Sequence, residues 1–225
     1  MTVIAKPRPY SYDCLMEPVI YSADIRRIRV DADSWTEKLR FSWPERVKKV
    51  CSYRVEEDRL RCLAAGLLLD AVFGGAGPGE EGLRYSEAGK PYYEEGPHFS
   101  LSHSGDYVLL AAGDYLVGID IEKWAEKDFI ALARRGFHPR EVSLIEKTPT
   151  AQTFFDIWVL KESYIKMQEP PPPGGTSSFF SLPGGLSAVC SDPSVNLRLY
   201  RQFPGYSIGL CSPHRGWPDG ITEMF

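Results

Sequence analysis

The spacing of apolar and polar positions predicts mainly helix over residues 44–73. Ser42 is a suitable N-cap, and Pro44 suits a first helical turn, where its missing N–H costs nothing. The later part of this segment begins with acidic residues and is apolar through its middle. It ends in Gly74 and Gly75, which is typical of a helix that runs into a glycine stop.

The following sequence predicts strands. A hairpin is expected in LRYSEAGKPYY (83–93), with EAGKP as its turn. The segment HFSLSHS alternates larger residues with serines, as a half-buried strand does, and two apolar strands follow around a short Gly-Asp turn. These three strands are expected at 98–104, 107–113 and 115–122.

The second half repeats the order of helices followed by strands. AQTFFDIWVLKESYIKMQ predicts a long amphipathic helix, and no helix can continue through the run from Pro170 to Pro173. Two shorter helices should precede it, the first ending at Gly136 and the second with Pro139 in its first turn. Short strands are expected at 179–184, 186–191, 195–203 and 206–212.

This order of elements predicts an α+β protein with two lobes of similar size, residues 1–115 and 116–225. The two halves share no sequence repeat, so any symmetry between them would be structural only. The chain is long enough for a substantial core, with 225 residues of which 43% are hydrophobic. The net charge of −4 gives no general electrostatic reason to bind nucleic acid or an anionic membrane, although a local basic patch is compatible with it.

The cysteines and the apolar runs indicate a cytoplasmic protein. An odd number of cysteines without a C-x-x-C pair favours reduced thiols, and a lone Cys211 and His214 make no zinc site. The N-terminal residues lack the apolar core of a signal peptide, and the longest apolar run is interrupted by Asp114 and too short to span a bilayer. The cysteines are Cys14, Cys51, Cys62, Cys190 and Cys211.

Two carboxylates follow an apolar strand in VGIDIEKW. Asp120 and Glu122 are separated by Ile121, so in a strand they point to the same face, where like charges repel. A strand that leaves the core for solvent would explain why Asp120 and Glu122 are polar, but it would not explain why they alternate with the apolar Ile121. A hard divalent cation explains both features better, because Mg²⁺ binds a few carboxylates and completes its shell with water and phosphate.

The long second-half helix places several functional side chains at three- and four-residue steps. Glu162 and Lys166 alone could be a surface pair worth about 0.3–0.5 kcal/mol, but Glu162 could also supply a third carboxylate to the cation. In FSLSHSG, His103 could be a structural residue, and the absence of G-x-S-x-G argues against a hydrolase nucleophile elbow. The helix residues predicted to share one broad face are Trp158, Lys161, Glu162, Ile165 and Lys166.

The order of four motifs is more informative than any one of them. GKP, FSLSHSG, VGIDIE and WVLKESYIK together resemble the 4′-phosphopantetheinyl transferase family, in its long single-chain, surfactin-synthetase-activating type. The resemblance is clear from Pro44 to Lys166 and weaker beyond. It implies two lobes in a pseudo-twofold arrangement, an active site in the cleft between them, and a monomer. Such enzymes transfer 4′-phosphopantetheine from coenzyme A to a serine of an apo acyl, peptidyl or aryl carrier protein and release 3′,5′-ADP.

The resemblance also implies roles for individual residues. Asp120, Glu122 and Glu162 match the family's carboxylates for Mg²⁺, with Mn²⁺ as a possible substitute, and the metal meets the pyrophosphate. The proton of the carrier serine passes to Glu162 or to a metal-bound water. The implied catalytic residues are Glu162, Lys161, Lys166 and His103. The implied coenzyme A contacts are Arg46, Lys49 and Arg61 at the 3′-phosphate, Gly89, Lys90 and Pro91 beside adenine, and Ser102, His103, Lys161 and Lys166 near the other phosphates.

The sequence departs from the family pattern at two places, and two other functions compete with transfer. Ser100 stands where the family usually has Asn, and a proline run replaces the usual glycine-rich stretch after the helix. A non-catalytic module that binds coenzyme A or a nucleotide is one rival, although the presence of all the carboxylates argues against it. A metal-dependent phosphate-ester hydrolase is the other, and it would release phosphopantetheine into solution.

Overall fold

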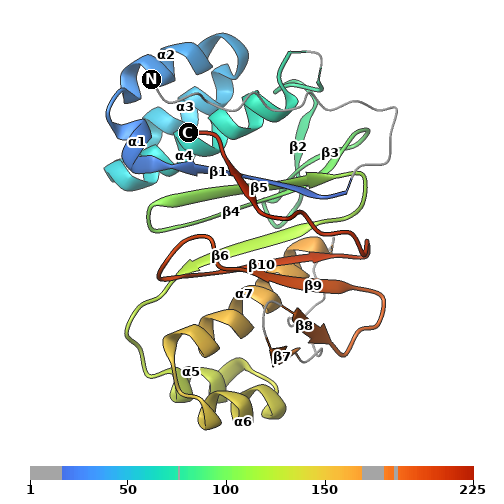
Figure 1. Cartoon of the computed structure of the whole chain (residues 1–225). Coiled ribbons are helices and arrows are strands. Elements are labelled where there is room, and N and C mark those ends of the chain that lie inside the picture. Colours follow the sequence, from blue (N-terminus) through green and yellow to red (C-terminus); the bar gives the residue numbers. More distant parts are fainter. Residues whose placement is uncertain (1–16, 76, 169–179, 185–186) are drawn as a thin grey trace.

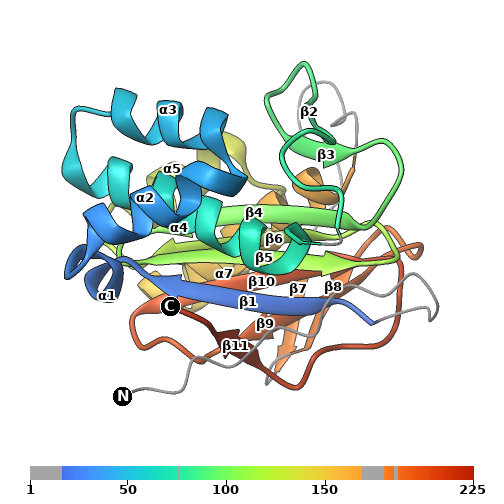
Figure 2. The same ribbon diagram turned by 90° about the horizontal axis from the view of Figure 1, so that it is seen from above.

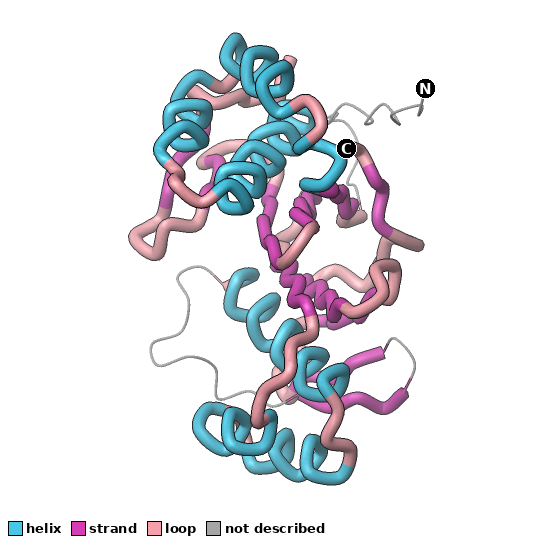
Figure 3. Tube along the Cα trace, turned by 90° about the vertical axis from the view of Figure 1, so that its left-hand side faces the viewer, coloured by secondary structure: helices cyan, strands magenta, loops and turns pink. Residues whose placement is uncertain are grey.

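A computed structural model of the chain describes residues 17–75, 77–168, 180–184 and 187–225. The stretch examined for a signal peptide and the run from Pro170 to Pro173 lie outside the described residues. Two β-sheets lie one beyond the other, and each is covered by helices on the side away from its neighbour (Figure 1). The tube view shows the same arrangement from another side, with helices gathered at both ends and strands between them (Figure 3).

The first sheet has four strands in the order β11-β1-β5-β4. Helix α4 packs on β1 and β5, and the shorter helices α1 to α3 pack around α4 (Figure 1). The strands of this sheet are β1 (Val19–Asp24), β4 (His98–Ser104), β5 (Tyr107–Gly113) and β11 (Ile221–Glu223). Its helices are α1 (Ile25–Arg29), α2 (Ala32–Ser42), α3 (Pro44–Ser52) and α4 (Glu56–Phe73).

The second sheet has five strands in the order β6-β10-β9-β8-β7. Helix α7 packs on β6 and β10, and α5 and α6 lie beyond it at the end of the molecule (Figure 1). The strands are β6 (Gly118–Lys123), β7 (Phe180–Gly184), β8 (Ser187–Cys190), β9 (Asn196–Tyr200) and β10 (Tyr206–Ser212). The helices are α5 (Phe129–Gly136), α6 (Pro139–Lys147) and α7 (Ala151–Met167).

A short hairpin stands apart from both sheets. It consists of β2 (Leu83–Tyr85) and β3 (Pro91–Tyr93), and the view from above shows it on the opposite side of the molecule from α1 (Figure 2). Its turn contains Gly89 with φ +81°, a conformation that favours glycine. The hairpin and its turn agree with the prediction from EAGKP.

Helix α7 lies unusually close to the second sheet because two strand residues lack side chains. A Cβ atom at Gly118 would collide with the carbonyl oxygen of Ser163, and one at Gly209 would lie 2.8 Å from the carbonyl oxygen of Val159. Glycine at these positions therefore allows the backbones of α7, β6 and β10 to approach one another. This approach brings the polar residues of α7 close to the carboxylates of β6.

The structure confirms the mixed α+β class and most of the predicted elements. The predicted helical segment is divided by an extended stretch at 53–55, and Pro139 begins α6 as expected. The sequence patterns did not identify β1, α1, α2 or β11. Strand β11 returns from the second half of the chain to pair with β1 in the first sheet, so the two sheets do not divide strictly at residue 115.

The prediction of Ser42 as the N-cap of the next helix was wrong. Ser42 is the last residue of α2, and Trp43 occupies the cap position of α3 without a side-chain hydrogen bond. The carboxylate of Glu80 instead accepts hydrogen bonds from the backbone N–H groups of Glu45 (2.9 Å) and Arg46 (2.6 Å). A residue distant in sequence therefore satisfies the free donors of this helix start, which local sequence could not reveal.

Two further sequence expectations agree with the described residues. Cys51, Cys62, Cys190 and Cys211 are free thiols. Across the described part of the chain, none of the helices combines the length and the apolar character needed to cross a membrane.

Candidate active site

The first feature of the site is the pair of carboxylates on β6. Asp120 is only 4% exposed, and its Oδ1 accepts hydrogen bonds from Ser102 Oγ (2.7 Å) and Lys166 Nζ (2.6 Å). Its Oδ2 is buried and has no hydrogen-bond partner among the described residues. Glu122 Oε2 accepts a hydrogen bond from Ser104 Oγ at 2.9 Å. The alternation along β6 therefore brings both carboxylates to β4, as the strand pattern predicts.

Glu162 of α7 joins this pair electrostatically. Burial raises its pKa above the ordinary value for Glu, and repulsion from the charges of Asp120 and Glu122 raises it further, while Lys166 acts in the opposite direction. The pKa of Glu122 is also raised, mainly by burial and then by Asp120, while its hydrogen bond from Ser104 lowers it. The negative charges of the strand pair thus act on Glu162, and both Glu122 and Glu162 ionise less readily than an ordinary Glu.

The donor set fits a hard divalent cation, although the side chains do not form a closed cage. No group of three His, Cys, Asp or Glu side chains within the described ranges is arranged to hold a metal ion directly. Lys166 is bound to one oxygen of Asp120, and the other oxygen lacks a partner among those residues. Clustered carboxylates and a buried oxygen without a donor are the groups that Mg²⁺ would satisfy.

The two lysines of α7 have different surroundings. Lys166 Nζ contacts both Ser102 Oγ (2.9 Å) and Asp120 Oδ1. Lys161 Nζ instead lies 3.2 and 3.0 Å from the two carboxylate oxygens of Glu141, which is fully buried. The rings of Phe137 and Phe180 flank the same ammonium group, each with its centroid 5.3 Å away.

The structure therefore does not bring Lys161 to the site as the motif implied. Its charge is already matched by Glu141, and a charge-matched ammonium inside an aromatic environment has little capacity left for a phosphate. The shared helical face predicted for α7 separates into two parts, because adjacent residues on a helix point about 100° apart. Glu162 and Lys166 lie toward β6, and Lys161 lies toward α6.

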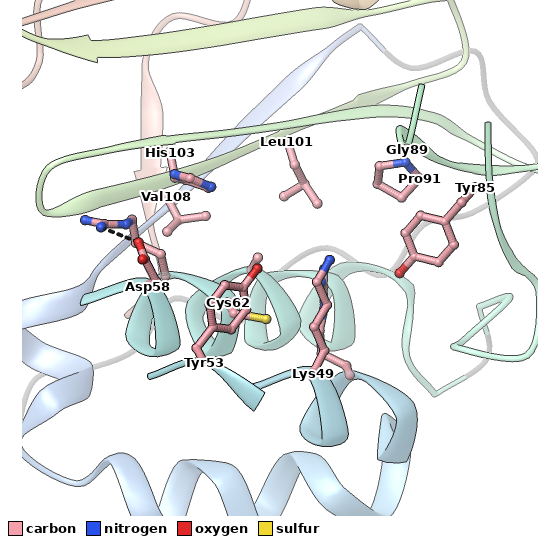
Figure 4. A pocket seen from close by; sticks show the side chains of 13 residues that line it. Lys49, Tyr53, Asp58, Cys62, Tyr85, Gly89, Pro91, Leu101, His103 and Val108 are labelled. Carbon is pink, nitrogen blue, oxygen red and sulfur yellow. Dashed lines mark hydrogen bonds and ion pairs between the residues drawn. The ribbon is translucent and has the colours of Figure 1, made fainter. Parts of the chain in front are cut away.

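A cavity of about 260 Å³ lies between the helices of the first half, the hairpin and β4. Figure 4 shows Lys49 extending from α3, Tyr53 from the stretch between α3 and α4, His103 and Leu101 from β4, and Tyr85 from the hairpin side. Arg61 also lines it and donates hydrogen bonds to Asp58 Oδ1 (2.8 Å) and to the carbonyl oxygen of Gly105 (2.9 Å). The predicted residues that meet here are Arg46, Lys49, Arg61, Gly89, Pro91 and His103.

Protonation of His103 is disfavoured in this cavity. The residue remains exposed to solvent, but desolvation by the cavity wall lowers the pKa of its imidazole below the ordinary value, and the positive charges of Arg61 and Lys166 lower it further. A bound anion would reverse the effect of these charges. The imidazole is therefore suited to gain a proton or donate a hydrogen bond when a phosphate arrives.

A second cavity of about 310 Å³ continues from the first toward α7. It shares Gly89, Pro91 and Leu101 with the first cavity, and it also includes Lys90 and Lys166. The two cavities together connect the cationic wall of the first half with the lysine that contacts Asp120. An elongated anionic ligand is the kind of molecule that fits such a path.

Several residues at the site were not identified by sequence reasoning. Ser104 contacts Glu122, and Tyr53 and Tyr85 line the first cavity. The alternating serines of FSLSHSG were a usable signal for Ser104, because alternate residues of a strand share a face. Nothing local in the sequence marks Tyr53, Tyr85 or the buried partner Glu141.

With this geometry established, comparison with known proteins identifies the family. The model of the 4′-phosphopantetheinyl transferase superfamily matches residues 116–202. The sequence is 31% identical over 197 residues to the 4′-phosphopantetheinyl transferase Sfp of Bacillus subtilis (strain 168), which covers 82% of this chain and 88% of that protein. The chain belongs to the 4′-phosphopantetheinyl transferase family.

Two other relatives match over shorter regions. The 4′-phosphopantetheinyl transferase gsp of Aneurinibacillus migulanus is 43% identical over 87 residues, which are 37% of this chain and 36% of that protein. The 4′-phosphopantetheinyl transferase HetI of Nostoc sp. (strain PCC 7120 / SAG 25.82 / UTEX 2576) is 36% identical over 123 residues, which are 49% and 52% of the two chains. The family predicted from the four motifs is thus confirmed.

Proposed function

We propose that this protein transfers the 4′-phosphopantetheine group of coenzyme A to a serine hydroxyl of an apo carrier protein and releases 3′,5′-ADP. The observation that carries the proposal is the continuity between a cation-lined cavity and the carboxylates next to Lys166. Coenzyme A has a charged nucleotide at one end and a pyrophosphate in its middle. It therefore needs this combination of a cationic pocket and a centre where a phosphate can react.

Mg²⁺, or Mn²⁺ in its place, would be held by Asp120, Glu122 and Glu162. The partnerless Oδ2 of Asp120 and the raised pKa values of Glu122 and Glu162 support this assignment. When bound, the metal supplies charge neutralisation to the pyrophosphate. The three carboxylates would determine the position of the cation. Two of them come from strand β6, and the third comes from helix α7, which packs on that strand.

Cations of the first cavity would bind the nucleotide end of coenzyme A. We assign Arg46, Lys49 and Arg61 to the 3′-phosphate, since their positive groups line one cavity. The turn formed by Gly89, Lys90 and Pro91 would lie beside the adenine. Each charge-assisted hydrogen bond to a phosphate contributes about 1.5–3 kcal/mol.

Residues between the two cavities would orient the pyrophosphate. Ser102 and His103 are neighbours on β4, and Lys166 reaches the hydroxyl of Ser102 from α7. We propose that Lys166 moves from Asp120 to a phosphate oxygen as the ligand binds. Positive side chains held there stabilise the charge that develops on the leaving group.

Glu162 is the proposed acceptor of the carrier serine's proton. Without a metal, burial and two neighbouring carboxylates raise its pKa; a bound cation would lower it, so the carboxylate would stay ionised and able to accept a proton. A water held beside the carboxylates is the alternative acceptor. Lys161 would act indirectly, through its buried contact with Glu141, by keeping α7 in position.

The wider arrangement is also part of the proposal. We propose that residues 1–115 and 116–225 act as two lobes related by a pseudo-twofold axis, apart from the returning strand β11, with coenzyme A between them. A single chain that supplies both lobes needs no partner copy, which favours a monomer. The free thiols of the described residues favour a cytoplasmic location.

Mass spectrometry tests the transfer directly. The protein should be incubated with an apo carrier protein, coenzyme A and Mg²⁺, and the carrier should gain the mass of one phosphopantetheine. A carrier of unchanged mass with coenzyme A bound would favour the non-catalytic module. An unchanged carrier with free phosphopantetheine in solution would favour the hydrolase. Apo fatty-acid, polyketide and peptide-synthetase carriers tested in parallel would identify the partner class.

A further inference from the structure

The two sheets meet at their edge strands β4 and β6, and side chains join them. Both strands are terminal in their sheets, and they lie side by side in the same direction (Figure 1). The N–H groups of Ile119, Ile121 and Lys123 donate to serine hydroxyls of β4. The acceptors are Ser100 Oγ at 3.1 Å, Ser102 Oγ at 3.3 Å and Ser104 Oγ at 3.1 Å, respectively.

The three contacts form a regular ladder. The serines are alternate residues of β4, the N–H groups belong to alternate residues of β6, and each contact joins residues 19 positions apart. In an ordinary sheet the neighbouring backbone carbonyls would accept these N–H groups. Here serine oxygens occupy that place, and Ser100 and Ser102 are buried.

The hydroxyl groups do more than accept hydrogen bonds. A serine hydroxyl has one donor and two acceptor positions, so it can serve a backbone N–H and a carboxylate together. Ser102 accepts from Ile121 and donates to Asp120, and Ser104 accepts from Lys123 and donates to Glu122. Asp120 and Glu122 each precede the β6 residue whose N–H group bonds the serine. At the Ser100 contact the residue in this place is Gly118, which has no side chain and so no carboxylate.

The ladder ends at a turn that is tied to both halves of the molecule. Gly105 follows Ser104, and its carbonyl oxygen accepts a hydrogen bond from Arg61 of α4. The next residue, Asp106, donates its N–H to the hydroxyl of Tyr206 on β10 at 3.1 Å. The cationic cavity and the carboxylate strand are therefore connected through one short, hydrogen-bonded segment.

We propose that Ser100, Ser102 and Ser104 form an intersheet serine ladder that sets the register between β4 and β6. In this way it holds Asp120 and Glu122 at a fixed distance from the cationic cavity. Ser104 is a positioning residue, because it acts on Glu122 and on the backbone of Lys123 at once. The effect of the ladder on metal binding and transfer rests on the proposed function. The hydrogen bonds of the ladder do not depend on it.

Amide hydrogen exchange followed by NMR tests the ladder without any enzyme activity. Ser104→Ala should increase the exchange rate of the Lys123 amide by at least about tenfold, while the Ile119 amide keeps its rate. Ser100→Ala should give the opposite pattern. Unchanged exchange at both amides, in variants that unfold at the wild-type temperature, would overturn the ladder. The same exchange measurements remain decisive if the wild-type protein proves unable to transfer phosphopantetheine.

The positioning role needs a second measurement. Ser104→Ala should raise the Mg²⁺ concentration for half-maximal transfer by roughly 10–100-fold, as the loss of a group that orients a metal ligand does. Ser104→Thr, which keeps the hydroxyl, should restore most of this loss. Ser100→Ala, which removes a contact without a carboxylate, should leave the Mg²⁺ dependence unchanged. Equal impairment by Ala and Thr at residue 104, or an equal shift in Ser100→Ala, would contradict the assignment.

Discussion

Lys166 Nζ lies 2.6 Å from Asp120 Oδ1, so a helix cation and a strand anion from opposite sides of the site are paired directly. Asp120 is almost fully buried, and Lys166 is partly exposed at the edge of the second cavity. The lysine thus compensates the buried charge while it remains next to the space for a ligand. The contact compensates a buried charge, and the same lysine is the group proposed to meet a phosphate.

Replacement of this lysine should affect stability and rate differently. Lys166→Met should lower the free energy of unfolding by about 1–3 kcal/mol, between the values for exposed and buried pairs, because Asp120 loses its counter-charge. Adding Asp120→Asn should recover part of the stability but none of the transfer activity. Urea denaturation and a carrier-loading assay measure the two effects. A double variant as unstable as the single one would show that the pair is not coupled.

Arg61 should recognise the 3′-phosphate of coenzyme A. Arg61→Ala should weaken the binding of coenzyme A, measured by titration calorimetry, by about 1.5–3 kcal/mol and that of dephospho-coenzyme A far less. Arg59→Ala is a matched control, because it removes a partly exposed arginine of the same helix that is not among the residues lining the cavity. Equal losses for both ligands would instead assign Arg61 to the support of Gly105.

Glu162 should have a role beyond holding a metal. Glu162→Gln keeps the size and one oxygen but removes charge and basicity, so saturating Mg²⁺ should leave kcat reduced by roughly 10²–10⁴-fold. Asp120→Asn should recover more of its rate at high Mg²⁺, since it is proposed only as a ligand. Complete rescue of Glu162→Gln by metal would leave a bound water as the proton acceptor.

Lys161 should be a structural residue. Lys161→Met leaves the buried carboxylate of Glu141 without its counter-charge and should cost about 3–5 kcal/mol of stability, with the KM for coenzyme A unchanged in the folded fraction. Combining it with Glu141→Gln should restore much of the loss. A large rise in KM without a loss of stability would instead support the phosphate contact implied by the motif.

His103 should make the free protein sensitive to acid. Its pKa is lowered in the folded state by desolvation in the cavity wall and by Arg61 and Lys166, while a backbone hydrogen bond and Asp58 act in the opposite direction. The unfolded protein, in which His103 has a pKa of about 6.5, therefore binds a proton more readily than the folded protein does. The free energy of unfolding should accordingly decrease as the pH falls through this value. The decrease in Tm between pH 7.5 and pH 5.5 should be smaller in His103→Asn than in the wild type, and a decrease of equal size would count against the assignment.

The sequence by itself determined most of the local elements between residues 44 and 212 and the family of the protein. Alternation in HFSLSHS and VGIDIEKW predicted two strands, and the strands then brought Asp120 and Glu122 to one face. Such patterns are readable because they follow from the periodicity of strands and helices. The family followed from the order of four motifs, and comparison confirmed it.

Only the tertiary structure decided which partners these residues have. Glu80, and not Ser42, accepts hydrogen bonds from the first N–H groups of α3. The ammonium group of Lys161 pairs with Glu141 and does not line either cavity. Strand β11 pairs with β1 in the first sheet. The serine ladder needs two strands whose contacts join residues 19 positions apart. Each of these relationships depends on burial and on contacts between distant segments, which local periodicity does not encode. A motif thus specified the side chains of the site, and packing determined which of their charges remain available for a ligand.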